Sequence, residues 1–223
     1  MTLRELKQLV SLGEGISLEF KRRVPRDERI AKEVIALANT NGGRILLGVD
    51  DDGTITGVDD AGEEEFVLRR AVEAHCQPPV EFTTERIVVA DRRDVLLVTV
   101  PESRSKPHHL VPAADEPSES VNGLPEDRPA YVRVEEMSVE ASPESVRMMR
   151  EDNEEQGVTF EFGENESLLM RYLDDYGRIT VAEFAKLADI SLEKASQTLV
   201  SLAKADLLRL HSDRTDDYFT LAY

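Results

Sequence analysis

The densest group of residues suited to chemistry lies near the N-terminus, where Glu14, Glu19 and Lys21 follow one another closely. Glu19 and Lys21 alternate with Leu18 and Phe20, a period of two that predicts a strand with one buried face. The two charged side chains therefore leave the same side of the strand, opposite the apolar pair. Glu14 precedes the strand at a glycine-flanked bend, which can turn its carboxylate towards that side.

A third carboxylate, from Asp50 or its neighbour Asp51, is expected at the end of the adjacent strand. Three converging carboxylates can hold a hard divalent cation, here Mg²⁺ or Mn²⁺ as candidate cofactor. Such an ion activates water for phosphodiester hydrolysis while a lysine neutralises developing charge. On this hypothesis Glu14, Glu19 and Asp50 are metal ligands, and together with Lys21 they are the catalytic residues. The simpler interpretation is a half-exposed strand with a surface ion pair, because carboxylates are abundant in this chain.

The most basic stretch of the chain follows directly, and its candidate nucleic-acid contacts are Lys21, Arg22, Arg23 and Arg26. Positive charge beside the carboxylate motif is where a groove for a phosphate backbone would be useful. An equally open interpretation is a solvated strand end, balanced by the acids around it.

Overall charge limits what the chain can bind. With 45 acidic and 27 basic residues among 223, its formal net charge is −18. An acidic surface repels phosphates, so any contact with nucleic acid has to be local. A single cysteine, Cys76, excludes an intramolecular disulfide framework, and no apolar run is long enough for a membrane helix. The N-terminus also lacks a signal-peptide pattern, so we expect a soluble, cytoplasmic protein without a membrane partner.

The elements indicate an α+β protein in two parts. Helices are expected at 3–12, 27–38, 62–75 and from 143 towards 155, with strands at 16–21, 44–49, 54–57, 80–90, 94–100 and 130–135. Asp27 is the expected N-cap of the second helix. Residues 101–128 read as a long polar loop that contains His108 and His109. No Gly-Lys-Ser or Gly-Lys-Thr phosphate loop is present, so ATP binding is not predicted.

The C-terminal part is predicted to be a small domain of its own. We expect a first domain at 1–152, a linker at 153–163 and a second domain at 164–223. Three helices followed by a two-stranded hairpin is the order of a winged helix-turn-helix domain. Its third helix offers Lys194 and Gln197 as candidate nucleic-acid contacts. A role in dimerisation or protein docking is equally open, because this segment is itself acidic.

Several motifs resemble the Schlafen AlbA_2 family in order and spacing. They are Glu14 and Glu19 with Lys21, then Ala38-Asn39-Thr40-Asn41-Gly42-Gly43, then Leu47-Gly48-Val49-Asp50-Asp51-Asp52-Gly53, and finally Tyr131-Val132-Arg133. The resemblance spans roughly residues 10–150. It implies a mixed-sheet domain associated with DNA binding. In vertebrate Schlafens it also implies a metal-dependent endoribonuclease, whose ligands would match Glu14, Glu19 and Asp50, with Lys21 contacting phosphate.

Three functions follow from these observations. The first is a nucleic-acid-binding protein, resembling a transcriptional regulator, that binds DNA or RNA and forms a homodimer or gains contacts through the winged helix. The second is a metal-dependent endoribonuclease that uses the carboxylates named above. The third is a non-catalytic protein-interaction scaffold, which the net charge of −18 favours.

Overall fold

The computed structural model describes residues 1–112, 128–151 and 163–223, and it divides into two compact units, Met1–Glu140 and Ala141–Tyr223. The expected first domain extended to residue 152, whereas this division assigns the helix that begins at Pro143 to the second unit. The expected linker, 153–163, lies almost entirely outside the described residues. Each unit is described below by itself.

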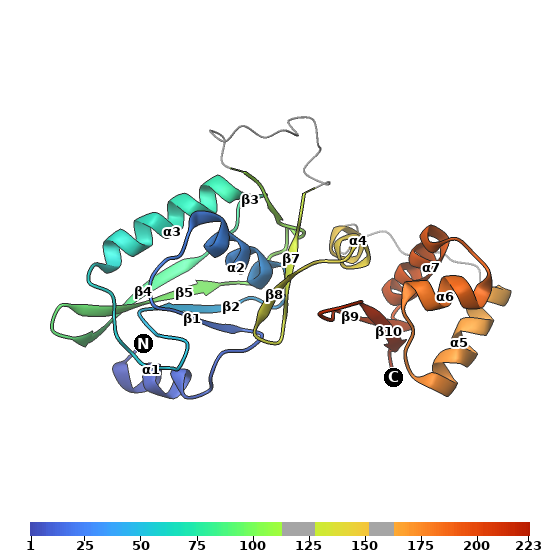
Figure 1. Cartoon of the computed structure of the whole chain (residues 1–223), viewed down its shortest axis with the longest axis horizontal. Helices are drawn as coiled ribbons and strands as arrows, with labels where there is room; N and C mark the ends of the chain where they lie inside the picture. The colour runs from blue at the N-terminus through green and yellow to red at the C-terminus, as the bar shows by residue number, and fades with distance from the viewer. Residues whose placement is uncertain (113–127, 152–162) are drawn as a thin grey trace. The chain divides into compact units, whose positions relative to one another are not determined.

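A four-stranded mixed sheet forms the centre of the first unit (Figure 1). Its order is β1 (Leu18–Lys21), β2 (Gly43–Leu47), β5 (Arg93–Val100) and β4 (Thr83–Ala90). The pair β1–β2 is parallel and the other two pairs are antiparallel. A parallel pair needs a crossover connection, and α2 (Asp27–Asn39) supplies it. The mixed sheet confirms the expected α+β architecture of this part of the chain.

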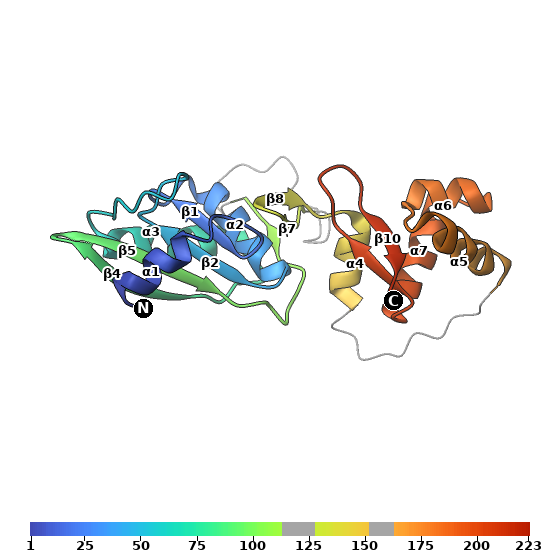
Figure 2. The ribbon, with the colours of Figure 1, turned by 90° about the horizontal axis from the view of Figure 1, so that it is seen from below.

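Helices cover both faces of this sheet (Figures 1 and 2). Helices α2 and α3 (Ala61–His75) pack on one face, and α1 (Leu3–Val10) packs on the other. Alternate residues of each strand therefore enter different cores. On the side of α2 and α3 the sheet contributes Ile45, Leu47, Leu96, Val98 and Val100. On the side of α1 it contributes Leu18, Phe20, Leu46, Ile87, Val95 and Leu97.

The sequence predicted the turn after α2 correctly but not the residue that caps its N-terminus. The N-cap is Arg26, which makes no side-chain capping bond, so the expectation for Asp27 is wrong. Asp27 lies inside the first turn, where its carboxylate pairs with Arg70 at 2.9 Å. At the other end Gly42 has φ +70°, and a Cβ there would lie 2.6 Å from the main-chain nitrogen of Glu102. Only glycine fits this turn, as the motif predicted.

Residues after β2 do not form the second strand expected at 54–57. Gly48 has φ +103° and turns the chain out of the sheet. A turn follows at Asp50–Gly53, and the return is limited to one isolated bridge between Val49 and Ile55. The turn was predicted correctly, but the residues beyond it make isolated main-chain contacts and no continuous ladder: Thr56 and Gly57 donate to the Gly48 carbonyl, and Val58 bridges to Asp94.

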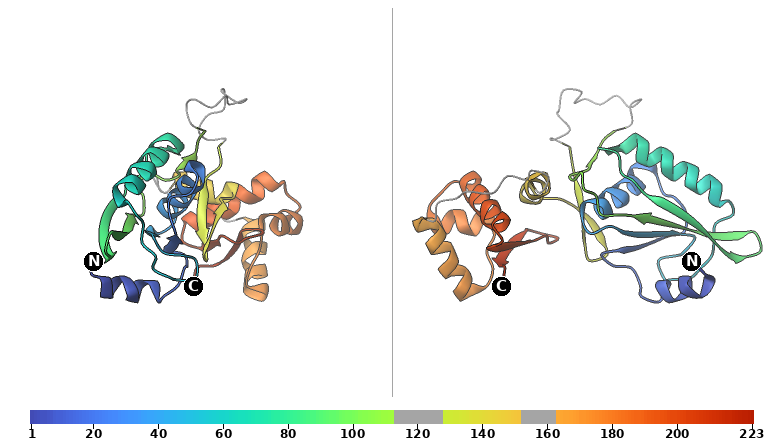
Figure 3. Two further views of the ribbon diagram at one scale, coloured as in Figure 1. Left: turned by 60° about the vertical axis from the view of Figure 1, so that its left-hand side comes forward. Right: turned by 180° about the vertical axis from the view of Figure 1, so that it is seen from behind.

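A small β-structure beside α2 completes the first unit (Figure 3). It comprises β3 (Cys76–Gln77), β6 (His109–Leu110), β7 (Tyr131–Val134) and β8 (Met137–Glu140), of which only β7 was predicted. His108 and His109 are buried, so the expectation that they lie in an open loop is wrong. Their main chain is fastened by Asn39, whose side chain bonds both the N–H and the C=O of His108. The rest of the expected loop, 113–127, lies outside the described residues.

In its described residues the second unit has four helices and a hairpin: α4 (Pro143–Glu151), α5 (Glu164–Tyr176), α6 (Val181–Ala188), α7 (Leu192–Lys204), β9 (Leu208–His211) and β10 (Tyr218–Leu221). Its last three helices and hairpin follow the order expected from the sequence. Thr180 forms a capping box with Glu183 at the start of α6, and Ser191 caps α7. The core is apolar and includes Leu169, Leu173, Phe184, Leu199, Leu202 and Phe219. Among all the described residues, no helix has the length and apolar character needed to cross a bilayer.

Candidate functional site

Strand β1 divides its side chains between the two faces of the sheet, as its alternating sequence predicts. Leu18 and Phe20 enter the core beneath α1, so Glu19 points to the opposite face, towards α2. That face is not open: Glu19 is only 5% exposed. A surface ion pair was the simpler expectation, but a buried carboxylate needs partners inside the protein.

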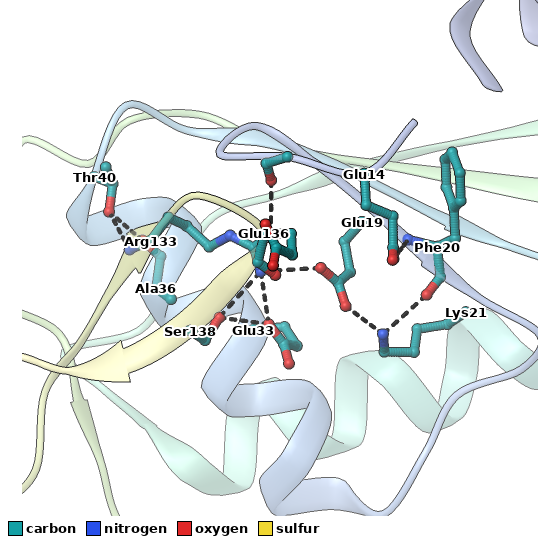
Figure 4. Close-up of polar contacts among 11 residues, drawn as sticks. Glu14, Glu19, Phe20, Lys21, Glu33, Ala36, Thr40, Arg133, Glu136 and Ser138 are labelled. Atoms are coloured by element: carbon teal, nitrogen blue, oxygen red, sulfur yellow. Dashed lines mark hydrogen bonds and ion pairs between the residues drawn. The ribbon is translucent and has the colours of Figure 1, made fainter. Parts of the chain in front are cut away.

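Two cations contact the Glu19 carboxylate (Figure 4). Lys21 Nζ donates hydrogen bonds to Glu19 Oε1 and, at 2.9 Å, to the carbonyl oxygen of Phe20. Arg133 Nη1 forms an ion pair with Glu19 Oε2 at 3.0 Å, but this oxygen accepts no hydrogen bond from any described residue. Burial raises the pKa of Glu19 above its ordinary value, and the hydrogen bond from Lys21 opposes that shift.

A second carboxylate, that of Glu33 in α2, joins the group through the same guanidinium. Arg133 Nη1 lies 3.0 Å from Glu33 Oε2, and the Ser138 hydroxyl donates to that oxygen at 2.5 Å. Arg133 Nη2 donates to the carbonyl oxygens of Gly15 at 2.7 Å and Glu136 at 3.0 Å. The Arg133 side chain is wholly buried, so it fastens β7 to α2 and to the segment before β1.

Sequence reasoning did not single out Glu33, and it noted Arg133 only as part of a resemblance. A signal for Glu33 was present, because it lies three residues after Ile30 and four before Leu37 and so shares their buried helix face. Arg133 alternates with two valines on its strand. The sequence alone therefore did not show whether the face that carries Arg133 is buried or exposed.

Glu14 serves a different part of the structure. Its Oε1 accepts a hydrogen bond from the main-chain N–H of Phe20 at 2.7 Å. It also lines a hollow of about 530 Å³ with Lys7, Asp51 and Asp52. Val10 and Phe20 of the α1 core line the same hollow, which lies apart from the face that Glu19 occupies.

The third expected ligand, Asp50, lies 3.7 Å from Arg22 Nε through its Oδ1. Each of the three carboxylates of the sequence hypothesis thus has its own partners: a main-chain N–H for Glu14, two buried cations for Glu19 and an exposed arginine for Asp50. In the part of the chain that the structure describes, no three His, Cys, Asp or Glu residues are grouped to hold a metal ion. The arrangement of Glu14, Glu19 and Asp50 therefore does not fit Mg²⁺ or Mn²⁺.

The basic stretch divides into one engaged and three exposed cations. Lys21 is largely buried against Glu19, so its ammonium is already neutralised. Arg22, Arg23 and Arg26 are exposed, and within the described ranges Arg22 has one distant carboxylate partner while no ion pair involves the other two. These three guanidinium groups are available to a ligand carrying negative charge.

The expected contacts of α7 are also at the surface. Lys194 and Gln197 are exposed, and Gln197 Nε2 donates a long hydrogen bond, 3.4 Å, to Glu193. Ser196, between them, faces inward and bonds to Arg147 and Glu144 of α4. One face of α7 is thus covered by α4, and the other carries one cation beside one acid.

Comparison with known proteins identifies the class to which this site belongs. The model of the family described as Schlafen, AlbA_2 matches residues 14–142, from the first glutamate of the motif to the second residue after β8. The match covers more than half of the chain. This protein is a member of the Schlafen AlbA_2 family.

Two solved structures resemble the chain at low identity. One is the N-terminal domain of a putative ATP-dependent DNA helicase RecG-related protein from Nitrosomonas europaea, at 19% identity and a TM-score of 0.37, covering 56% of this chain and 95% of that one. The other is the DIP2311 protein from Corynebacterium diphtheriae, at 15% identity and a TM-score of 0.41, covering 70% of this chain and 33% of that one. Both TM-scores are low, so the family match alone assigns the class. No curated protein matches the chain.

Proposed function

We propose that this protein binds DNA or RNA through the exposed arginines that follow β1, in a role like that of a transcriptional regulator. Membership of the AlbA_2 family indicates a nucleic-acid-related role. The observation that carries the proposal is the exposure of Arg22, Arg23 and Arg26 directly after the family motif. Guanidinium groups suit phosphate recognition because they donate in a fixed, planar geometry.

The net charge of −18 determines how such binding must behave. Only a few phosphates can be neutralised, since most of the surface repels them. With three arginine contacts, the logarithm of the affinity is expected to fall with the logarithm of salt concentration with a slope of roughly −2 to −3. Binding should therefore be measurable at low salt and weak at physiological salt.

The test is fluorescence polarisation with labelled single- and double-stranded DNA and RNA at about 20 mM salt, far below physiological ionic strength. Arg22→Glu/Arg23→Glu should weaken binding at least tenfold. Arg4→Glu/Arg104→Glu makes the same change in net charge at exposed positions elsewhere and should weaken it far less. Equal weakening by both variants would contradict a local site, and no binding by the native chain would leave the scaffold function.

We propose that the second unit is used as a winged helix that adds nucleic-acid contacts or joins two chains. The support is its element order and the exposure of Lys194 and Gln197 on α7. Lys194→Ala/Gln197→Ala should lower affinity severalfold if α7 reads nucleic acid. Unchanged affinity together with a dimeric mass by light scattering would favour the role in assembly.

A metal-dependent endoribonuclease remains the alternative. One observation favours it: Glu14, Asp51 and Asp52, from two segments of the chain, line the same hollow. Structure-specific RNA cleavage in Mn²⁺, lost in a Glu14→Ala variant that remains folded, would establish it. Binding without cleavage under the same conditions would reject it.

A further inference from the structure

Arg133 is surrounded by oxygen acceptors. Its guanidinium is within 3.2 Å of five oxygen atoms: one from each of the carboxylates of Glu19 and Glu33, two main-chain carbonyls and the Ser138 hydroxyl. Carboxylate, carbonyl and hydroxyl oxygens are the ligands that hard divalent cations take in proteins. Here the cation that they surround is a side chain of the same chain.

The charges of this group balance without any ion from outside. Glu19 and Glu33 are its two carboxylates, and Lys21 and Arg133 are the two cations that contact them. A divalent ion added to this buried group would leave it with an excess positive charge far from water, which is strongly unfavourable. The space between the two carboxylates is also occupied, since Arg133 Nη1 lies 3.0 Å from an oxygen of each.

One oxygen is nevertheless incompletely satisfied. Glu19 Oε2 is buried and has a charged neighbour in Arg133, yet it accepts no hydrogen bond from any described residue. The Nε of Arg133 is likewise buried without an acceptor in the described part of the chain. An oxygen in this position could approach a smaller cation directly.

We propose that Arg133 is a built-in cation: it occupies a latent divalent-metal cage formed by Glu19 and Glu33 and thereby makes the family motif of this chain independent of metal. The native chain does not bind Mg²⁺ or Mn²⁺ at this group. Removing the guanidinium opens a site for a divalent cation. The inference does not depend on whether the chain binds nucleic acid.

The test is a Mn²⁺ titration followed by the electron paramagnetic resonance signal of the free ion, with native protein and Arg133→Gln. The variant keeps a polar side chain and loses the charge. It should bind one Mn²⁺ per chain at least tenfold more tightly than the native protein. Adding Glu19→Gln to this variant should abolish the gain.

The matched control is Arg86→Gln, because Arg86 also lies between two carboxylates, Asp60 and Asp94, but at the exposed surface. It should leave Mn²⁺ binding unchanged. A folded Arg133→Gln that gains no affinity overturns the proposal. So does native protein that binds Mn²⁺ as tightly as the variant and loses it on Glu19→Gln.

A second measurement decides the matter if Arg133→Gln does not fold. In the native protein the main-chain amide resonances of Lys21 and Arg133 should survive a stoichiometric amount of Mn²⁺, since the cage is filled. Paramagnetic broadening of those two resonances before others would show an ion beside Glu19 and would overturn the proposal.

Discussion

The first unit contains two carboxylate–guanidinium pairs that each include a residue in or just after β1. One pair is buried and the other is largely exposed. Arg133 and Glu19 lie 3.0 Å apart with side chains 0% and 7% exposed. Arg22 and Asp50 lie 3.7 Å apart with side chains 78% and 30% exposed. The first pair lies under α2 and the β7–β8 hairpin, and the second lies in solvent.

The difference shows that burial, not residue type, decides what these groups do. In water an ion pair contributes little, since solvation and salt compete with it. Inside the protein each charge depends on the other, because neither can return to water while the fold is intact. The buried pair is therefore expected to hold the structure, and the exposed arginine is free to meet a ligand.

The largest expected effect is on stability when the buried pair is broken. Arg133→Met should lower the free energy of unfolding by about 3–5 kcal/mol, because it leaves two buried carboxylates with a single cation. Arg22→Met should change it by no more than about 1 kcal/mol. Urea denaturation followed by circular dichroism measures both.

If both variants lost equally little free energy of unfolding, the comparison would fail, because burial would not distinguish the two ion pairs. Equal large losses would mean that Arg22 has a structural partner under solution conditions. Repeating both titrations at high salt sharpens the result, because screening reaches only the exposed pair.

The next largest effect concerns Asn39, which is buried like Glu19 but uncharged. Its amide donates to the carbonyls of His108 and Tyr131 at 2.9 and 3.0 Å, and its oxygen accepts from the His108 N–H at 2.8 Å. Asn39→Ala leaves three buried main-chain groups unpaired and should cost roughly 2–4 kcal/mol. Asn39→Asp, which retains only the acceptor, is the matched variant and should also destabilise, because its charge is buried. A loss below about 0.5 kcal/mol for both would contradict the hydrogen bonds described.

Sequence patterns predicted most of the sheet and its helices because apolar periodicity reports which face of an element is buried. They placed Glu19 and Lys21 on one side of β1 correctly. They did not indicate what lies opposite that side, since β7 and β8 come from more than a hundred residues further along the chain. The expected meeting of Glu14, Glu19 and Asp50 had no such periodic signal behind it.

A smaller effect is expected from pH, through His108. Its Nδ1 lies 2.8 Å from the Pro78 carbonyl and so donates to it, while Nε2 accepts from the Ser103 hydroxyl at 2.6 Å. Burial lowers the pKa of His108, the hydrogen bond to the Pro78 carbonyl opposes that shift, and His109 and Lys106 lower the pKa further, so folding favours the neutral ring. Below about pH 6.5 the unfolded chain takes up the proton more readily than the folded one.

Stability contributed by this histidine is therefore complete above about pH 6.5 and declines as the pH falls, by at most about 1.4 kcal/mol per pH unit. His108→Gln should flatten the decline below about pH 6.5, the unperturbed histidine pKa. Denaturation curves at several pH values measure it. A variant with the same slope as the native protein would show that other groups cause the decline.

The smallest effect is also the most discriminating, because the competing functions predict opposite signs for it. Asp50→Asn removes a half-buried carboxylate with one distant partner and should change stability by no more than about 0.5 kcal/mol. If Arg22 contacts phosphate, the substitution frees that guanidinium and removes a repelling charge, so affinity for nucleic acid should rise about two- to threefold at low salt. If Asp50 is a metal ligand, the same substitution should abolish Mn²⁺-dependent cleavage. Fluorescence polarisation and a cleavage assay on one preparation measure both outcomes. The control for charge alone is Asp52→Asn, because Asp52 lies in the same turn but has no arginine partner in the described residues.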